Sequence, residues 1–378
     1  MNSFKICGQF GIEAVAKKDI VKGLINNTCL ITAKNGKRYI LQEINANIFK
    51  NVEELMNNIE RVTDHIRRKT TMERSETTTL NLVKANGKNY TTIVGEDGKP
   101  HYYRMYEYID NASSFDQANE ELLYQAGVGF GDFQRQLADF PAEQLYETIP
   151  DFHNTKARFQ QFLDAYDFAA QQGDPMSIFK SKKEIQYALD NQQYSRIIVD
   201  ALESKQIPYR VVHNDTKLNN VMLDNRTHQP VCVIDLDTIM PGSLLYDYGD
   251  AIRYGANASV EDDRNLSNVK IDMAKFRAFT DGFLKKTAGS ITTNELNLMA
   301  QAPIVLTYEL GLRFLADYLN GNQYFRCDSS RPDHNLERAR AQFTLMQDMI
   351  NHLPEMQQII NELYHKNRTL YDPTSILL

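Results

Sequence analysis

VVHNDTKLNNVMLDNRTHQPVCVIDLDT, residues 211–238, sets several Asp and Asn side chains beside two short apolar runs of strand character. An unpaired charge next to a buried strand is costly, so these polar side chains need partners. His213, Asp215 and Asn220 form the pattern H-x-D-x-x-x-x-N, and Asp235 follows later, at the end of the second run. An Asx-rich turn requires neither these offsets nor flanking strands, so the stretch indicates a catalytic loop.

This order and spacing match the catalytic and metal-binding segments of protein kinases. In such a site a carboxylate aims the attacking hydroxyl group and accepts its proton, which suits Asp215. Mg²⁺ held on oxygen ligands offsets the charge of a nucleotide triphosphate. Asp235 supplies an anionic ligand and Asn220 a neutral one. We therefore predict phosphoryl transfer from ATP, with Asp215 as catalytic base and Mg²⁺ bound by Asn220 and Asp235.

Other polar residues near the motif have supporting interpretations. His213 is predicted to orient the loop, and Asp237 to be a hydrogen-bonded carboxylate at a strand end. Lys217 either approaches the transferred phosphoryl group or is exposed to solvent, and the residues leave both open. In MPGSLLYDYGDAIR, residues 240–253, Asp247 is predicted to cap a helix and to brace the catalytic loop.

Bulk properties set limits on the protein's organisation and partners. The 378 residues exceed the usual size of one core, about 250–300 residues, so two lobes with a cleft are expected. A net charge of −7 argues against a nucleic-acid partner. No segment approaches the roughly 20 apolar residues of a membrane span, and no secretory signal is recognisable, so we expect a cytoplasmic protein without a membrane partner. The scattered cysteines are expected to be reduced thiols: Cys7, Cys29, Cys232 and Cys327.

The chain changes character near residue 109. Up to that point, Asn35-Gly36 and Asn86-Gly87 turns between β-rich runs predict a mostly antiparallel sheet, interrupted by one helix at 51–69. Beyond it, YRVVH and VCVIDLD are the only clear strands, predicted as a short internal hairpin, and helical patterns cover 116–139, 154–172, 180–204, 270–287, 293–320 and 335–365. We predict an α+β fold with a nucleotide-binding lobe, 1–108, and a larger, mainly helical catalytic and substrate-binding lobe, 109–378.

Taken together, these residues resemble the phosphotransferase family that includes aminoglycoside phosphotransferases and choline kinases, whose two-lobe fold is protein-kinase-like. Within it, the chain is most similar to the N-acetylhexosamine 1-kinases. The phrases that carry the similarity are GLINNTCLI (23–31), YILQEINANIFKNVEELMNNI (39–59), IPDFHNTKARFQQF (149–162), HNDTKLNNVML (213–223), VIDLDTIMPGSLLYDYGDAIR (233–253) and ELGLRFLADYLNGNQYF (309–325).

The resemblance implies transfer of the γ-phosphoryl group of ATP to the anomeric hydroxyl group of N-acetylglucosamine or N-acetylgalactosamine. It also implies a sugar pocket between the catalytic loop, with Lys217, and a late helix that supplies Arg313 and Tyr324. His153 and Arg158 are further candidates for this pocket. Arg offers a fork of donors and Tyr an aromatic wall, although ordinary helix packing and a structural His account for the same residues.

The phosphate-binding region departs from the protein-kinase pattern. Only Gly23 stands where kinases have G-x-G-x-x-G, and Gln42 in YILQEI replaces the strand lysine. We expect a turn of Asn26, Asn27 and Thr28, together with Gln42, to contact the phosphates, while an ordinary hairpin is the alternative.

The adenine is expected at the lobe junction. There, RMYEYIDN crosses from sheet to helix, and its backbone could bind the base edge at Glu107, Tyr108 and Ile109.

Two alternatives to the sugar 1-kinase differ in function. The first is the same chemistry on an aminoglycoside, choline or homoserine; an aminoglycoside requires unpaired carboxylates, and choline an aromatic cage. The second is a catalytically silent kinase-like module, which the missing strand lysine favours and the intact Asp215, Asn220 and Asp235 oppose. The sequence leaves the preferred sugar, the phosphorylated position and the oligomeric state undetermined.

Overall fold

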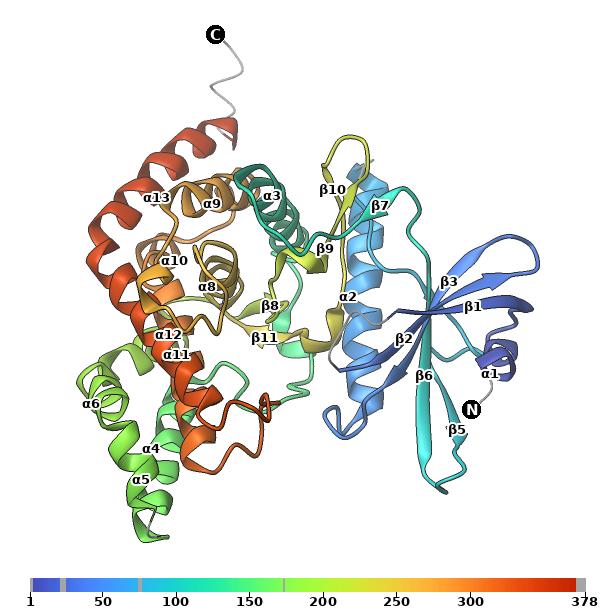
Figure 1. Ribbon diagram of the computed structural model, residues 1–378. Coiled ribbons are helices and arrows are strands. Elements are labelled where there is room, and N and C mark those ends of the chain that lie inside the picture. The colour runs from blue at the N-terminus through green and yellow to red at the C-terminus, as the bar shows by residue number, and fades with distance from the viewer. Residues whose placement is uncertain (1–2, 21–24, 74–76, 173, 372–378) are drawn as a thin grey trace.

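The computed structural model describes residues 3–20, 25–73, 77–172 and 174–371. These residues form two lobes of different composition, a sheet-rich N-terminal lobe and a mainly helical C-terminal lobe (Figure 1). The expected fold class, a protein-kinase-like α+β arrangement, is confirmed.

The N-terminal lobe is built on an antiparallel sheet with the strand order β1-β2-β3-β6-β4, and β5 pairs with β6. Tight turns with positive φ at Gly36 and Gly87 reverse the chain where Asn-Gly pairs predicted them. The elements are α1 (Ser3–Gln9), β1 (Ala14–Ile20), β2 (Asn27–Ala33), β3 (Arg38–Ile44), α2 (Val52–Glu73), β4 (Leu82–Val83), β5 (Thr91–Val94) and β6 (Pro100–Glu107).

Helix α2 lies between the sheet and the C-terminal lobe (Figure 1). Its apolar side chains recur at helical spacing and are buried in a core that also contains Leu236 and Ile239 from the catalytic region. The buried Asn58 side chain donates to the carbonyl oxygens of Tyr146, at 2.8 Å, and Ile239, at 3.0 Å. The two lobes therefore share one apolar core.

The C-terminal lobe is mainly helical. It contains β7 (Ala112–Ser113), α3 (Glu120–Gln136), η1 (Ala142–Gln144), α4 (Thr155–Gln171), α5 (Pro175–Lys180), α6 (Lys182–Asp190), η2 (Gln192–Ser195), α7 (Ile197–Glu203), β8 (Arg210–Val212), η3 (Leu218–Asn220), β9 (Val221–Asp224), β10 (Pro230–Val233), η4 (Leu236–Thr238), β11 (Met240–Gly242), α8 (Leu244–Gly255), η5 (Leu266–Asn268), α9 (Met273–Thr287), α10 (Thr293–Leu298), α11 (Ala302–Leu319), α12 (His334–Asn351), α13 (Leu353–Arg368) and η6 (Thr369–Tyr371).

Three helices that the sequence predicts as continuous are divided in the structure. The segment 293–320 forms α10 and α11, and 335–365 falls on α12 and α13. Pro303 and Pro354 stand in the first turn of α11 and α13, where a proline is tolerated but continuation from a preceding helix is blocked. The segment 180–204 breaks into α6, η2 and α7.

The predicted internal hairpin is also different. Strand β8 pairs with β11, not with the strand that precedes Asp235. That strand, β10, pairs with β9, which in turn pairs with β7. The catalytic segment is thus held by two small sheets, and Asp235 lies in the connection from β10 to β11.

The described residues contain no helix that is long and apolar enough to cross a membrane. All four cysteines, which lie within the described ranges, are free thiols, and three of them are buried.

Candidate active site

The catalytic loop begins at His213, whose ring is fully buried. The ring Nε2 lies 2.8 Å from the carbonyl oxygen of Ile234, and the Asp215 backbone N–H donates to ring Nδ1 at 3.3 Å. A carbonyl can only accept, so Nε2 carries the proton and Nδ1 is the acceptor. One imidazole therefore joins Asp215 to the residue before Asp235, which fits the orienting role predicted for His213.

Asp247 braces the same loop from α8. Its two carboxylate oxygens accept the backbone N–H groups of His213, at 2.9 Å, and Asn214, at 2.8 Å, and it also accepts from Gln134 at 2.7 Å. Burial raises the pKa of Asp247, and the hydrogen bonds that the carboxylate accepts oppose that rise. The helix cap is Ser243, not Asp247 as predicted, because α8 begins three residues before Asp247.

Asp215, Lys217 and Asn220 meet in the loop after β8. Lys217 Nζ lies 2.6 Å from Asp215 Oδ1, and Asn220 Nδ2 donates to the Asp215 carbonyl at 2.8 Å and to its Oδ2 at 3.2 Å. Burial lowers the pKa of Lys217, but the attraction of Asp215 and Asp250 outweighs it and leaves the pKa raised. The ammonium group is therefore charged and held beside the carboxylate predicted to be the base.

Asp235 stands in a left-handed backbone conformation, with φ 61°, at the start of η4. Such a conformation is uncommon outside glycine but is tolerated by Asp and Asn. The protein packed around it, followed by the negative charges of Asp237 and Asp215, raises the pKa of Asp235 to about 6. Its side chain is nevertheless open to solvent.

The residues present fit a hard divalent cation. Asp235 and Asn220 offer oxygen donors, and the carboxylates of Asp215 and Asp237 add negative charge close to Asp235. The backbone N–H of Ile234 donates to the Asn220 carbonyl at 2.9 Å, which ties η3 to the end of β10. Asn220 and Asp235 would hold the ion.

A chain of buried and half-buried polar groups links the sheet to this region. Thr28 Oγ1 accepts from Gln42 Nε2 at 3.1 Å, and Gln42 Oε1 accepts from Arg104 Nε at 2.9 Å. Arg104 forms an ion pair with Asp237, which also accepts from the side chain of Asn26. Arg104 was not among the sequence-predicted residues; a lone Arg within the apolar and aromatic strand HYYRMYEY was the available signal.

The expected phosphate-binding turn is not a turn in the described residues. Asn27 and Thr28 open strand β2, and Gly23 lies outside the described residues. Because side chains alternate along a strand, Asn27 points to the opposite face of the sheet from Thr28, where it donates to Glu43 at 3.3 Å. The structure therefore brings Asn26, Thr28 and Gln42 toward Asp237 but leaves Asn27 apart.

The lobe junction carries the three residues expected near adenine. The Glu107 backbone N–H donates to the Asn81 carbonyl at 2.9 Å, and the Tyr108 backbone N–H donates to the Arg38 carbonyl at 3.1 Å. Ile109 packs against the core shared by the lobes. Two of these backbone donors are thus already engaged within the sheet.

The predicted acceptor-side residues lie around Phe152 and Glu309. His153 Nδ1 contacts the buried Glu309 carboxylate at 3.0 Å, and Arg313 Nη1 lies 4.0 Å from it. Arg158 donates to the Phe152 carbonyl at 2.9 Å, and the Arg313 guanidinium lies 6.0 Å from the Phe152 ring centroid. Sequence reasoning missed Glu309, a buried carboxylate that an amphipathic helix pattern does not reveal.

Three contacts complete the acceptor side. The Arg313 guanidinium lies 5.4 Å from the ring centroid of Phe325, which packs edge-on against Tyr324 at 4.9 Å. Tyr324 is 75% exposed, so its ring is available to a ligand. The His153 ring also reaches the Asn214 carbonyl at 3.4 Å, which connects this cluster to the catalytic loop.

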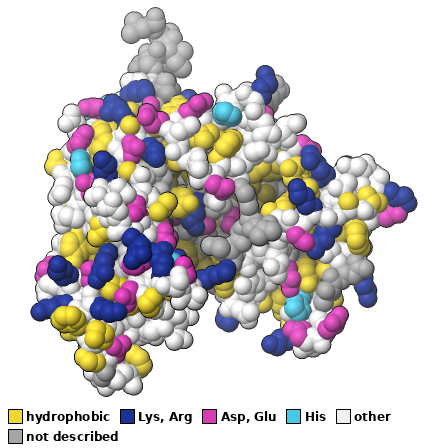
Figure 2. All heavy atoms as spheres, viewed as in Figure 1, with side chains coloured by type: hydrophobic (Ala, Val, Ile, Leu, Met, Phe, Trp, Pro, Cys, Tyr) yellow, Lys and Arg dark blue, Asp and Glu magenta, His cyan; other side chains and the backbone are white. Residues whose placement is uncertain are grey.

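Two guanidinium groups, those of Arg158 and Arg313, lie near each other on the acceptor side. Burial lowers the pKa of Arg158, and the neighbouring Arg313 guanidinium lowers it further. Burial lowers the pKa of His153, but the Glu309 carboxylate raises it, and the net effect is a rise. Glu309 is paired with His153 and Asp250 with Arg253, whereas the Asp151 carboxylate, which lies near Arg158, accepts from the Asn154 side chain at 2.7 Å. The surface is hollowed between the two lobes (Figure 2).

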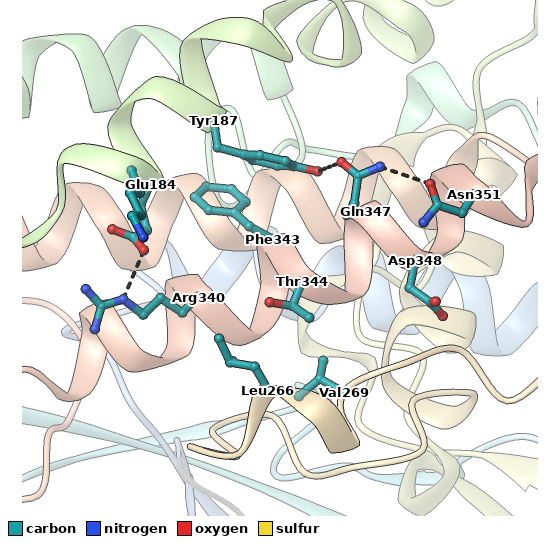
Figure 3. Close-up of a pocket in the computed structure, with 11 residues that line it drawn as sticks. Glu184, Tyr187, Leu266, Val269, Arg340, Phe343, Thr344, Gln347, Asp348 and Asn351 are labelled. Carbon is teal, nitrogen blue, oxygen red and sulfur yellow. Dashed lines mark hydrogen bonds and ion pairs between the residues drawn. The ribbon is translucent and has the colours of Figure 1, made fainter.

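A separate cavity of about 440 Å³ lies in the C-terminal lobe between α6, η5 and α12 (Figure 3). Its polar side chains largely bind one another: Tyr187 Oη donates to Gln347 at 3.2 Å, and Arg340 Nε donates to Glu184 at 2.9 Å. Its described lining includes none of the predicted site residues, so it is distinct from the catalytic region.

Comparison with known proteins places these features in context. The model of the family described as "Phosphotransferase enzyme family" matches residues 18–279, which include β2, β3 and the whole catalytic segment.

Solved structures with the same fold share little sequence with the chain. A microcompartment-associated aminopropanol kinase aligns with a TM-score of 0.58 and 13% identity over 94% of this chain and 98% of its own. An aminoglycoside phosphotransferase from Alicyclobacillus acidocaldarius aligns with a TM-score of 0.59 and 15% identity over 96% and 97%. An amicoumacin kinase, solved with AMP-PNP, Ca²⁺ and Ami, aligns with a TM-score of 0.53 and 13% identity over 88% and 87%.

Proposed function

Because the chain belongs to the phosphotransferase enzyme family, we propose that it transfers the γ-phosphoryl group of ATP to the anomeric hydroxyl group of an N-acetylhexosamine. The product is the sugar 1-phosphate. The family membership supports phosphoryl transfer, and the choice of acceptor rests on the acceptor side of the site and on the sequence phrases that resemble the N-acetylhexosamine 1-kinases.

In the proposed reaction Asp215 takes the proton of the attacking hydroxyl group. Its carboxylate is fixed by Lys217 and Asn220, so it can aim the hydroxyl oxygen at the γ-phosphorus. Lys217, held charged beside it, faces the negative charge that develops on the transferred group. Asn220 and Asp235 would hold Mg²⁺, which would supply positive charge to offset that of the phosphates.

The observation that carries the acceptor assignment is the pair of guanidinium groups at Arg158 and Arg313. They lie close enough for Arg313 to lower the pKa of Arg158, and the nearby Glu309 is already paired with His153. A cationic acceptor, such as choline or an aminoglycoside, meets electrostatic repulsion from these two guanidinium groups. A neutral sugar with an amide carbonyl accepts hydrogen bonds from such groups.

An acceptor screen tests this function. ATP consumption should be fastest with N-acetylglucosamine or N-acetylgalactosamine, slower with glucose and galactose, and at background with choline, homoserine and aminoglycosides. Phosphorus NMR of the product should show phosphate on the anomeric oxygen. A phosphate on the 6-hydroxyl would overturn the 1-kinase assignment, and turnover of a cationic acceptor alone would overturn the acceptor class.

Replacing Arg313 with Met should raise KM for the sugar by about 10-fold or more. A hydrogen bond from a charged group is worth about 1.5–3 kcal/mol, and each 1.4 kcal/mol is tenfold. KM for ATP should stay within about twofold. Steady-state kinetics with each substrate varied provides the measurement. Arg277→Met, on the exposed face of α9 and paired with Glu362 at 3.1 Å, is the matched control. An unchanged sugar KM in Arg313→Met would remove Arg313 from the pocket.

A further inference from the structure

The sheet face that looks toward the catalytic loop has a neutral residue at the position of the kinase lysine. Gln42 stands on β3, and Arg104 is its direct cross-strand partner on β6. Arg104 donates from Nε to the Gln42 side chain at 2.9 Å and is only 1% exposed. A positive charge is therefore present at this place, one strand away from where kinases carry it.

The other end of Arg104 reaches across to the C-terminal lobe. Its Nη1 forms an ion pair with Asp237, which is also buried and lies two residues beyond Asp235. Burial alone lowers the pKa of Arg104, but the Asp237 carboxylate outweighs this effect and the pKa is raised. Removing one partner of such a buried pair leaves an uncompensated charge, so the pair acts as a unit.

Helix α2 does not provide the partner that a kinase lysine has. It presents the neutral Asn58 to the C-terminal lobe, and Glu60 pairs instead with Lys84 at 3.2 Å on the exposed side. In protein kinases the strand lysine pairs with a helix glutamate. Here the buried inter-lobe pair joins β6 to η4, directly beside the proposed metal ligand.

We propose that Arg104 is a positioning residue for the nucleotide phosphates, which takes the place of the strand lysine and acts through Gln42 and Asp237. Because Arg104 is buried, it orients these two side chains and offsets the charge of Asp237, rather than touching the phosphates. Through Gln42 it also fixes Thr28 at the start of β2. This inference rests on the proposed binding of ATP.

The charge balance explains why such a residue is needed. Asp215 and Asp237 lie close enough to Asp235 for their negative charges to act on it, and Asp237 is paired with Arg104. An anionic nucleotide is repelled by the same charges until cations offset them. Arg104 supplies one permanent positive charge there, independent of any metal ion.

The test measures ATP binding without metal, by calorimetry in EDTA. Arg104→Met should weaken metal-free ATP binding by about tenfold or more and leave sugar affinity unchanged. The conservative variant Arg104→Lys keeps a positive charge beside Asp237 and leaves Gln42 in place. Its metal-free ATP affinity should stay within about threefold of the wild type. Lys34→Met, an exposed cation paired with Glu13 at 2.6 Å, is the control.

The outcomes separate this inference from the proposed function. Wild-type protein that binds no ATP contradicts the function itself. If the wild type binds ATP and a folded Arg104→Met variant binds it with the same affinity, the proposed role of Arg104 is overturned. If Arg104→Met does not fold, Arg104→Lys decides. A folded Arg104→Lys protein that binds metal-free ATP tenfold more weakly than the wild type overturns the inference, because its positive charge is kept.

Discussion

Asp215→Asn is expected to lower kcat by about 10²–10⁴-fold, the range associated with a general base. Asparagine keeps the shape of the side chain and can still meet Asn220 and Lys217, but it cannot take a proton at neutral pH. ATP binding should stay within about threefold of the wild type, because the proposed nucleotide contacts lie elsewhere. A coupled assay of ADP release gives kcat, and calorimetry gives ATP affinity.

The matched control is the same substitution at Asp224. Asp224 Oδ1 accepts the backbone N–H groups of Arg226, at 3.0 Å, and Thr227, at 2.8 Å, in an exposed turn, and asparagine can replace it there. Asp224→Asn should therefore retain wild-type kcat. Turnover by Asp215→Asn at more than a tenth of the wild-type rate would remove Asp215 as the base.

The strand and loop around Asp215 were predictable because their information is local. Asp215 and Asn220 lie in a short loop after strand β8, as expected, and Asp235 follows strand β10, but β10 pairs with β9 rather than with β8. The strand pairing around them was not predictable: β8 is three residues long and pairs with β11, which the sequence does not mark as a strand. Such short strands are selected by the packing of the whole lobe rather than by their own propensity.

Charged residues in the core are a second feature that could not be predicted from the sequence. Arg104 and Glu309 are buried because partners distant in the chain neutralise them, Asp237 for the first and His153 for the second. Periodicity reports apolar faces and is blind to paired charges within them. Likewise, the helical period continues across Pro303, and only the position of that proline marks the boundary between α10 and α11.

The second large effect is expected for Asp235→Asn, with opposite consequences for activity and stability. Loss of the anionic oxygen ligand should lower kcat/KM by about 10³-fold and raise the half-saturating Mg²⁺ concentration at least tenfold. Asparagine tolerates the left-handed backbone at this position, so the loop should keep its conformation. Metal titrations of activity provide the measurement, with Asp224→Asn as control. An unchanged Mg²⁺ requirement would exclude Asp235 as a ligand.

Without metal, the same variant should be more heat-stable than the wild type at pH 7.5. Packed protein and the charges of Asp237 and Asp215 raise the pKa of folded Asp235 to about 6, above the value near 3.9 of an unfolded chain. The ionised carboxylate therefore penalises the folded state above pH 6, and the penalty fades as pH falls through 6 toward 4. Tm measured in EDTA should be higher for Asp235→Asn at pH 7.5, and the difference should shrink at pH 4. If Asp235→Asn has a lower Tm than the wild type at pH 7.5, the Asp235 carboxylate stabilises the fold. The interpretation that this carboxylate lowers stability in order to bind a cation would then be wrong.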